Sequence, residues 1–320
     1  MAVKKVGFVG LGAMGRGLAG NLVRKGFDVA VWDISAAAVD AFIAKYGGRK
    51  AVSIATLAAE CDVICTMVPD APDVRRAALA EDGIIAGAHP GLIYIDFSTV
   101  DPTTSRAVGA ALAQKAVRML DSPVGRGVVE AENGTVTFMV GGDVATLEEV
   151  RPLLAAMSSE IMHIGALGAG TTIKLVNNYL AAAMVATIAE AVAFGTKSGV
   201  TLEQIISLSD KTGTSNRILN TVLPSKAFRA DYTPGFASRL AAKDHRLAMR
   251  LGADMGVDLP VGRAVLDLLE RCEADFRDDD FMGSILRRYE SESGTKLRLA
   301  GLTEEATGVL PTTVKQEETQ

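Results

Sequence analysis

The chain has 320 residues, of which 48% are hydrophobic and 22% are charged. This balance is typical of a globular protein long enough for two domains, and it excludes a disordered or fibrous chain. The formal net charge of −5 argues against a nucleic-acid partner, because neutralising phosphates requires a concentrated basic surface.

Cysteines and histidines are too few and too irregularly spaced for a disulfide framework or a metal site. The cysteines are Cys61, Cys65 and Cys272, and the first two flank an apolar run, which favours buried structural thiols over redox function. No signal peptide precedes the first predicted strand. The sequence therefore predicts a cytoplasmic protein without a metal.

The first half of the chain alternates short apolar runs with amphipathic stretches. Runs rich in Val and Ile predict strands at 3–9, 28–32, 62–68 and 92–97. The stretches between and after them predict helices at 12–25, 36–46, 72–80 and 102–116. This alternation predicts a doubly wound α/β domain, with parallel strands and helices on both faces. Later runs at 117–121, 135–140 and 160–164 are predicted to extend the same sheet.

Strand signals stop after Gly170, and the rest of the chain reads as helical. A long helix is predicted over about 171–197, and Thr201 with Gln204 fits a capping box that opens the next helix. We predict a first domain at 1–166, an all-helical domain at 167–297 and a mobile tail at 298–320. A ligand is expected in a cleft between the two halves.

One segment of this helical half imitates a membrane span. Residues 175–194 are mostly Ala, Val, Leu, Met and Ile, but Asn177, Asn178 and Glu190 interrupt them. Charged side chains are costly in lipid, so a central helix buried between domains or subunits is the favoured interpretation.

A glycine-rich loop directly follows the first predicted strand and opens the first helix. It has the GxGxxG pattern of dinucleotide sites: Gly10 permits a tight turn, Gly12 lets the backbone approach a pyrophosphate, and Gly15 allows close helix–strand packing. The phosphates would meet free N–H groups at the positive end of the helix dipole. The predicted cofactor-binding residues of this loop are Gly10, Gly12, Ala13, Met14 and Gly15.

Asp33 ends the second predicted strand, at the distance from the loop where dinucleotide-binding proteins place an acidic residue. A carboxylate there binds the adenosine ribose and repels the 2′-phosphate of NADP, so NAD is predicted over NADP. The alternative is that Asp33 or Ser35 only caps the next helix. A methyltransferase could use a similar loop and acid, but the later motifs argue against it.

Four separated motifs, in one order, resemble those of the β-hydroxyacid dehydrogenases, the family that contains 3-hydroxyisobutyrate dehydrogenase. They are the glycine loop at 7–15, Asp121-Ser122-Pro123-Val124, the run at 165–170 followed by Lys174, Asn177 and Asn178, and Lys243-Asp244. The resemblance extends over both halves of the chain. Four ordered matches are far more specific than any one of them.

This resemblance implies roles for particular residues and an assembly. Lys174 would be the catalytic lysine, with Asn177 binding the substrate, and Val68 and Thr99 would line the cofactor near the nicotinamide. Lys243 would contact the cofactor from the helical half. The family typically forms dimers or tetramers, so a homodimer or homotetramer is expected.

Helical spacing supports the catalytic role independently of the resemblance. Lys174, Asn177 and Asn178 lie at i, i+3 and i+4, with Ala181 at i+7, which places them along one helix face. Polar groups inside an apolar helix need partners, and a site holding substrate and cofactor would supply them. The alternative is a lysine that reaches solvent and asparagines that bond to neighbouring backbone.

The substrate loop departs from the family pattern, with Gly125-Arg126-Gly127 where most members have Ser-Gly-Gly. This variant resembles the sulfolactaldehyde reductases of the family, although they carry Thr at Gly127 and Ser at Ala181. The resemblance implies that Arg126 binds a substrate anion, for which its guanidinium is well shaped. The alternative is a surface ion pair with Glu130 or Glu132. The predicted substrate-binding residues are Ser122, Gly125, Arg126, Asn177 and Asn178.

Together these features predict an NAD-dependent oxidoreductase acting on a small anionic β-hydroxy acid or its semialdehyde. The substrate would be a sulfonate, such as 3-sulfolactaldehyde and its alcohol, or a carboxylate of the 3-hydroxyisobutyrate or tartronate semialdehyde type. Two other functions compete with this one. An imine reductase shares the scaffold but usually lacks the lysine, and a non-catalytic dinucleotide-binding module would have lost Lys174 or the glycine loop.

Overall fold

The computed structural model describes residues 5–299. The chain divides into two compact units, of which the first comprises Met1–Ala183 and Leu240–Asp267 and the second Met184–Arg239 and Leu268–Gln320. The first half of the long helix therefore belongs with the sheet, together with a helical segment from late in the chain. The boundaries predicted at 166 and 297 stay a prediction, and most of the predicted tail lies outside the described residues.

The sheet of the first unit has the strand order of a dinucleotide-binding fold, β3-β2-β1-β4-β5-β6, continued by β8 and β7, with β9 paired to β8. The strands are β1 Lys5–Val9, β2 Asp28–Trp32, β3 Arg49–Lys50, β4 Val63–Thr66, β5 Ile93–Asp96, β6 Arg118–Asp121, β7 Val124–Gly125, β8 Val136–Gly141 and β9 Ser158–Gly165. The α/β fold class is confirmed. The extension differs from an all-parallel sheet, because β8 runs antiparallel to β6 and β7.

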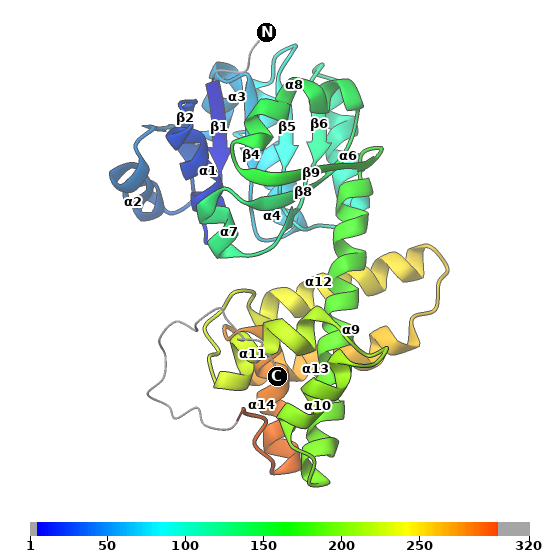
Figure 1. Ribbon diagram of the computed structural model, residues 1–320. Coiled ribbons are helices and arrows are strands. Elements are labelled where there is room, and N and C mark those ends of the chain that lie inside the picture. Colours follow the sequence, from blue (N-terminus) through cyan, green and yellow to red (C-terminus); the bar gives the residue numbers. More distant parts are fainter. Residues whose placement is uncertain (1–4, 300–320) are drawn as a thin grey trace, which may run out of the picture. The chain divides into compact units, whose positions relative to one another are not determined.

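Helices cover both faces of this sheet, as Figure 1 shows for α1, α6 and α8 around the strands. They are α1 Gly15–Arg24, α2 Ala36–Tyr46, α3 Ile54–Glu60, α4 Ala71–Leu79, α5 Ile84–Gly87, α6 Pro102–Ala113, α7 Val128–Asn133 and α8 Val144–Ala155. Successive strand residues point to opposite faces. Phe8 and Ile95 accordingly lie in one buried cluster, and Val9 and Tyr94 in the other.

The strand order reverses direction at β1, and the loops after four adjacent strands meet at the carboxyl edge of the sheet. Such a reversal is where open α/β sheets bind ligands. Gly10 follows β1, Val68 follows β4, Thr99 follows β5 and Ser122 follows β6. The fold thus gathers residues that are more than 100 positions apart in the sequence at one edge.

The cysteines are buried free thiols, which confirms their structural assignment. Burial raises the pKa of Cys61 to about 11 and that of Cys272 to about 12, and it raises the pKa of Cys65 further. A thiol with a raised pKa carries little nucleophilic thiolate at neutral pH.

Helices make up the described chain after β9. They are α9 Ala169–Lys197, α10 Leu202–Asp210, α11 Leu223–Ser225, α12 Ser238–Asp254, α13 Pro260–Asp275 and α14 Phe281–Ser293, with short 3₁₀ and π turns before α12. The predicted capping box is confirmed, because Thr201 accepts from the Gln204 N–H and the Gln204 side chain accepts in return. Pro260 opens α13 at the first helical position, where its missing N–H is harmless.

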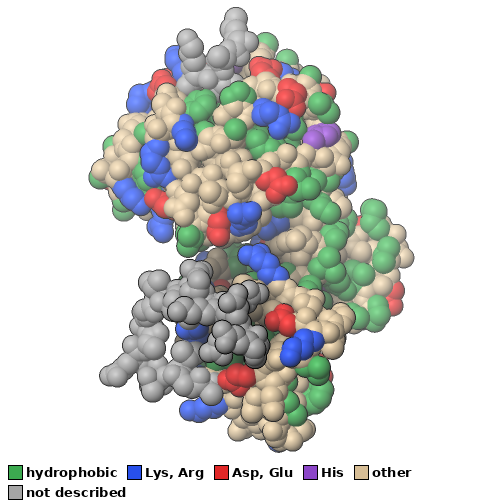
Figure 2. All heavy atoms as spheres, viewed as in Figure 1, with side chains coloured by type: hydrophobic (Ala, Val, Ile, Leu, Met, Phe, Trp, Pro, Cys, Tyr) green, Lys and Arg blue, Asp and Glu red, His purple; other side chains and the backbone are tan. Residues whose placement is uncertain are grey.

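By length and composition α9 could cross a membrane, with a mean hydropathy of 1.5 over its most apolar window. Only 33% of that window is buried inside the structure. The exposed remainder includes the polar Asn177, together with the apolar side chains of Val176 and Leu180. On the face of the first unit shown in Figure 2, acidic and basic side chains are interspersed rather than gathered by sign.

Candidate active site

The glycine loop has the geometry that a dinucleotide requires. Gly10 has φ +94°, and a Cβ there would lie 2.2 Å from the Met67 carbonyl oxygen, while a Cβ on Gly15 would lie 2.0 Å from the Gly10 oxygen. Both positions therefore need glycine for the fold itself. Gly12 has nothing within 4 Å of its ideal Cβ, so its backbone is left open.

The N-terminus of α1 follows this loop without a side-chain cap. Within the described chain, no hydrogen bond engages the backbone N–H groups of Gly12, Ala13 and Met14. Free N–H groups at a helix N-terminus form a site for phosphate. These residues thus fit the pyrophosphate of a dinucleotide.

Asp33 connects the end of β2 to the glycine loop. Its Oδ2 accepts from the Leu11 N–H at 2.7 Å and its Oδ1 from the Ser35 N–H at 2.8 Å. The cap of α2 is Ser35, which accepts from the Ala38 N–H, so Asp33 is not the helix cap. Its half-exposed carboxylate keeps lone pairs for ribose hydroxyls. The next residues are Ile, Ser and three Ala, which offer no cation to a 2′-phosphate.

Lys243 of α12 joins the loops after β4 and β5. Its Nζ donates to the carbonyl of Thr99 at 2.6 Å and to that of Pro69 at 3.1 Å. It also lies 3.0 Å from Oδ1 of the neighbouring Asp244. The structure thus brings Lys243 together with the loops that carry Val68 and Thr99.

Asp244 is the centre of a polar cluster between α9 and α12. Its side chain is only 3% exposed, and its Oδ2 accepts from Asn178 Nδ2 at 2.7 Å. Asn177 Nδ2 in turn donates to Asn178 Oδ1 at 3.2 Å. Both asparagines are therefore tied to a carboxylate that also faces two lysines.

Lys174 lies beside this cluster and is partly buried on α9. Its pKa is lowered mainly because burial disfavours the ammonium; the nearby Asp244 carboxylate opposes this effect, and Lys243 reinforces it. A lysine with a lowered pKa releases its proton more readily than an ordinary lysine, as an acid–base group must. Proton transfer is therefore the chemistry that this group suits.

Asp121 fixes the start of α9 against the sheet. Its Oδ1 accepts from the Gly168 N–H at 2.6 Å and its Oδ2 from the Thr171 N–H at 2.7 Å. A carboxylate at a helix N-terminus is favourably placed. It sets the position of Lys174, one helical turn farther on.

Ser122 follows Asp121 and is fully buried. Its Oγ has no hydrogen-bond partner in the described chain. Buried hydroxyls usually have a partner, so this orphaned oxygen is consistent with a ligand or water completing its bonding. Its predicted role in substrate binding stays a prediction, because the side chain is covered here.

Arg126 is exposed and has φ +74°, a left-handed conformation that is unusual for a residue other than glycine. Glu130 instead bonds the Gly127 N–H at 3.0 Å and caps α7. Glu132 bonds Tyr46 and pairs with Arg24 and Lys45. Neither glutamate forms the ion pair considered as the alternative for Arg126, so that alternative is wrong.

The structure therefore places Lys174, Asn177, Asn178 and Lys243 in one cluster. Sequence reasoning missed the central member, Asp244, although it quoted the residue within a motif. A signal was present: Ala241, Asp244 and Ala248 share one helical face, so a charge stands on the buried side of α12. A buried charge of that kind indicates a paired, functional group.

Comparison with known proteins agrees with this geometry. Residues 5–165 match the model of the NAD binding domain of 6-phosphogluconate dehydrogenase. Residues 168–289 match the model described as the NAD-binding domain of NADP-dependent 3-hydroxyisobutyrate dehydrogenase. The fold and the two matches define an NAD-binding oxidoreductase with a helical C-terminal part.

Individual relatives narrow the class. The chain is 35% identical to an NAD-dependent L-serine dehydrogenase of Pseudomonas aeruginosa, covering 83% of this chain and 91% of that protein. It is 30% identical to a 3-sulfolactaldehyde reductase of Escherichia coli, covering 90% and 97%. The structure of Mycobacterium tuberculosis 3-hydroxyisobutyrate dehydrogenase with L-serine matches at a TM-score of 0.84 and 33% identity, covering 90% and 99%.

The chain belongs to the 3-hydroxyisobutyrate dehydrogenase family, as its motifs indicated. It is an NAD-dependent oxidoreductase that acts on hydroxyl groups or on the corresponding carbonyls. The expected fold, family and cofactor are thereby confirmed.

The position of Asp244 generates a prediction about pH. Asp244→Asn removes the carboxylate that favours the Lys174 ammonium, so the pKa of Lys174 should fall further. If Lys174 supplies the proton during carbonyl reduction, the ammonium is then lost at a lower pH. The basic limb of the kcat–pH profile for reduction should move to lower pH.

The matched control is Asp258→Asn, which removes an exposed carboxylate of the same unit that pairs with Arg263. This control should leave the profile in place. A basic limb at the wild-type pH in the Asp244 variant would show that this carboxylate does not tune the lysine.

Proposed function

We propose that Lys174 is the proton donor and acceptor of this dehydrogenase and that Asn177 and Asn178 orient the substrate. One observation carries the proposal: Lys174 lies beside Asp244, whose neighbour Lys243 bonds both loops that carry Val68 and Thr99. The Lys174 amine is thus connected, through Asp244 and Lys243, to the loops predicted to line the nicotinamide.

The cofactor residues fit a dinucleotide, since the α1 N-terminus is uncapped, Gly12 is uncovered and Asp33 is half-exposed. The bound cofactor would supply the hydride chemistry, acceptance from the substrate carbon as NAD and donation to it as NADH. During reduction the carbonyl oxygen gains negative charge as the hydride arrives, and the Lys174 ammonium stabilises this oxygen and gives it a proton. During oxidation the neutral amine removes the hydroxyl proton as the hydride leaves.

Lys174→Ala tests this assignment. Loss of a positioned acid–base group should lower kcat by about 10²–10⁴-fold. The affinity for NADH, measured by calorimetry, should stay nearly unchanged because Lys174 lies outside the glycine loop. Wild-type turnover in this variant would refute the role, and loss of NADH binding would indicate a structural effect instead.

We propose that the substrate is a small β-hydroxy acid or semialdehyde whose anionic group is bound by Arg126. Within the described chain Arg126 has no ion pair, and its left-handed backbone costs roughly 1–2 kcal/mol. Strained backbone of this kind clusters at active sites and ligand-binding loops. Gly125 and Ser122 would complete the loop around the substrate.

A sulfonate is one of two candidate anions, because the Gly125-Arg126 variant resembles the sulfolactaldehyde reductases and one of them is among the relatives. The reaction would interconvert 3-sulfolactaldehyde and 2,3-dihydroxypropane-1-sulfonate. Gly127 and Ala181 lack the hydroxyls of those enzymes, which favours the carboxylate alternative. L-Serine and 3-hydroxyisobutyrate, which occur in the relatives' names, represent that alternative.

Two variants of Arg126 separate anion binding from backbone strain. Arg126→Ala and Arg126→Gly should both raise the KM for the anionic substrate by about tenfold or more, since a charge-assisted pair is lost. The glycine variant should also be more stable to urea than the alanine variant, because glycine adopts positive φ freely.

The measurement compares KM for the sulfonate, for L-serine and for a neutral aldehyde such as glyceraldehyde. The substrate whose KM rises most in the Arg126 variants, relative to the wild-type protein, carries the preferred anion. Equal effects on charged and neutral substrates would remove the anion-binding role of Arg126.

A non-catalytic dinucleotide-binding module is the alternative of another class. Retention of Lys174 together with its polar cluster argues against it, as it argues against an imine reductase. We propose further that the protein is soluble and cytoplasmic, like a metabolic dehydrogenase, with no nucleic-acid or membrane partner.

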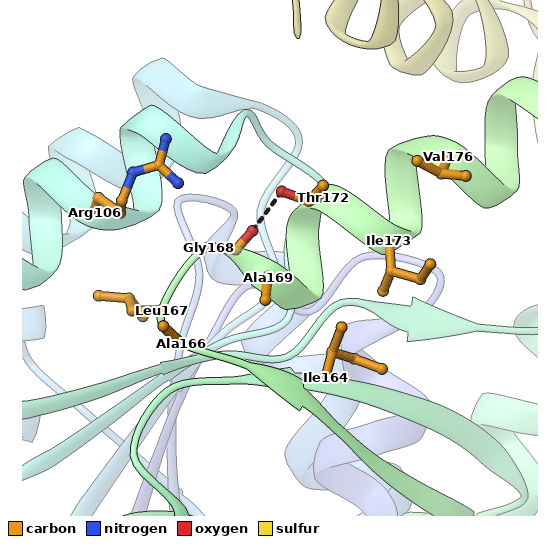
Figure 3. A pocket seen from close by; sticks show the side chains of 9 residues that line it. All are labelled: Arg106, Ile164, Ala166, Leu167, Gly168, Ala169, Thr172, Ile173 and Val176. Carbon is orange, nitrogen blue, oxygen red and sulfur yellow. Dashed lines mark hydrogen bonds between the residues drawn. The ribbon is translucent and has the colours of Figure 1, made fainter. Parts of the chain in front are cut away.

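We propose that α9 mediates assembly into a homodimer or homotetramer. Ile173, Val176 and Leu180 are 36%, 45% and 54% exposed and lie at i, i+3 and i+7 on one helix face. Figure 3 shows Ile173 and Val176 lining a mostly apolar hollow with Ile164 and Leu167, which Arg106 also lines. No charged residue occurs between Lys174 and Glu190. An uncharged stripe beside a hollow suits a second copy related by a two-fold axis.

Leu180→Glu should disrupt this assembly, because it would bury a charge at the interface. Light scattering after gel filtration should then report a smaller species. Val144→Glu, which introduces the same charge at an exposed apolar position of α8 (53% exposed), should leave the mass unchanged. An unchanged mass for Leu180→Glu would exclude this face as the interface.

A further inference from the structure

The carboxyl edge of the sheet carries polar residues at equivalent positions of three adjacent strands. Thr66 ends β4, Asp96 ends β5 and Asp121 ends β6, and the strand register pairs Thr66 with Asp96 and Asp96 with Asp121. All three are 1% exposed or less. Asp121 has a structural task at α9, whereas neither the family motifs nor the mechanism above uses Asp96.

Asp96 connects the loop after β4 with the loop after β5. Its Oδ1 accepts from Thr66 Oγ1 at 2.7 Å and from the Ser98 N–H at 3.0 Å. Ser98 Oγ in turn accepts from the Val68 N–H at 3.0 Å. One carboxylate therefore holds the β4 loop and the β5 loop in a fixed relation.

Val68 and Thr99 are the residues assigned above to the nicotinamide side. Lys243 bonds the carbonyls of Pro69 and Thr99, one residue beyond Val68 and Ser98 respectively. Two connections therefore hold these loops together. Asp96 and Ser98 form one of them, and the Lys243 side chain, which bonds a carbonyl of each loop, forms the other. Neither Asp96 nor Thr66 is exposed, so neither can contact the cofactor itself.

We propose that Asp96 is a positioning residue for the nicotinamide end of the cofactor: its carboxylate fixes the wall formed by Val68 and Thr99. The proposal rests on the proposed function in one respect, the assignment of Val68 and Thr99 to the nicotinamide. The dinucleotide's phosphates and adenosine, held by the glycine loop and Asp33, do not depend on this carboxylate.

The buried carboxylate is sensitive to pH. Burial raises the pKa of Asp96 to about 6, while the hydrogen bonds from Ser98 and Thr66 oppose this rise. The titratable groups that face it are Asp121 of β6, which raises its pKa, and Tyr94 of β5, whose hydroxyl bonds to Thr66 at 2.8 Å. Protonation weakens charge-assisted bonds, so the wall should loosen as the pH falls through this value.

Calorimetry with two ligands tests the proposal directly. NADH carries the nicotinamide, and ADP-ribose has the same adenosine and pyrophosphate without it. Asp96→Asn should weaken NADH binding at pH 7.5 by about tenfold, as expected for the loss of charge-assisted bonds, and should change ADP-ribose affinity less than about twofold. Ser105→Ala, which removes a buried hydroxyl of α6 without a partner in the described chain, should alter neither.

Thr66→Val provides a second variant that keeps the carboxylate. It removes a hydrogen bond that favours the ionised form, so the pKa of Asp96 should rise. Wild-type NADH affinity should fall below pH of about 6, and this inflection should move to higher pH in Thr66→Val. In Asp96→Asn it should be absent, and ADP-ribose binding should show no such inflection in any of the proteins.

The outcomes separate the possible failures. Equal loss of NADH and ADP-ribose affinity, or an inflection that Thr66→Val leaves in place, would overturn the positioning role. Absence of NADH binding by the wild-type protein would instead refute the proposed cofactor site. If Asp96→Asn does not fold, the pH shift in Thr66→Val decides the matter alone.

Discussion

The carboxylate of Asp244 is the interaction on which the candidate site depends. It is almost fully buried, yet it lies against Lys243, accepts from Asn178 and favours the ammonium of Lys174. A lone buried carboxylate would be strongly destabilising, and a lone buried lysine would lose its proton. Asp244 is connected to Lys243 by an ion pair and to Asn178 by a hydrogen bond, and the helices that carry these groups must then lie side by side. Packing of Leu175 against Leu247 and Ala248, and the stacking of Tyr179 on His245, secure the same pair of helices by apolar contact.

A second constraint places this helix pair at the sheet. Asp121 accepts two backbone N–H groups at the start of α9, and glycine is required beside it, since a Cβ on Gly170 would lie 2.2 Å from the Met139 carbonyl oxygen. Lys243 makes the other connection, to the loops after β4 and β5. The carboxyl edge of the sheet therefore contacts α9 through the Asp121 carboxylate and the close approach of Gly170. It contacts α12 through the Lys243 ammonium. Such contacts fix direction as well as distance, which apolar packing alone does not.

Much of this could be predicted from the sequence because it is local. The helix at 36–46 was predicted with its observed bounds, since Ser35 caps it and Gly47 follows it. The glycine loop and Asp33 were recognisable by spacing alone. The antiparallel direction of β8 could not be predicted, because the six-residue α7 separates β8 from β7 and no local signal sets the direction of a strand. Asp96 and Asp244 were missed as site residues for a related reason. Their partners are about 30 and 66 positions away, so their burial follows from strand register and helix packing.

Three residues of the described chain share a physical property: each costs stability where it stands. Asp96 has a carboxyl oxygen without a partner in the described chain, Asp244 is a buried charge, and Arg126 holds a left-handed backbone. A sequence selected for folding alone would replace them with asparagine, leucine or glycine. Local rules that assume a consistent fold therefore fail at these positions, and such failures concentrate where binding or chemistry opposes stability. Asp96 and the neighbour of Asp244, Lys243, both bond the loops after β4 and β5, so two of these costs meet at the same candidate site.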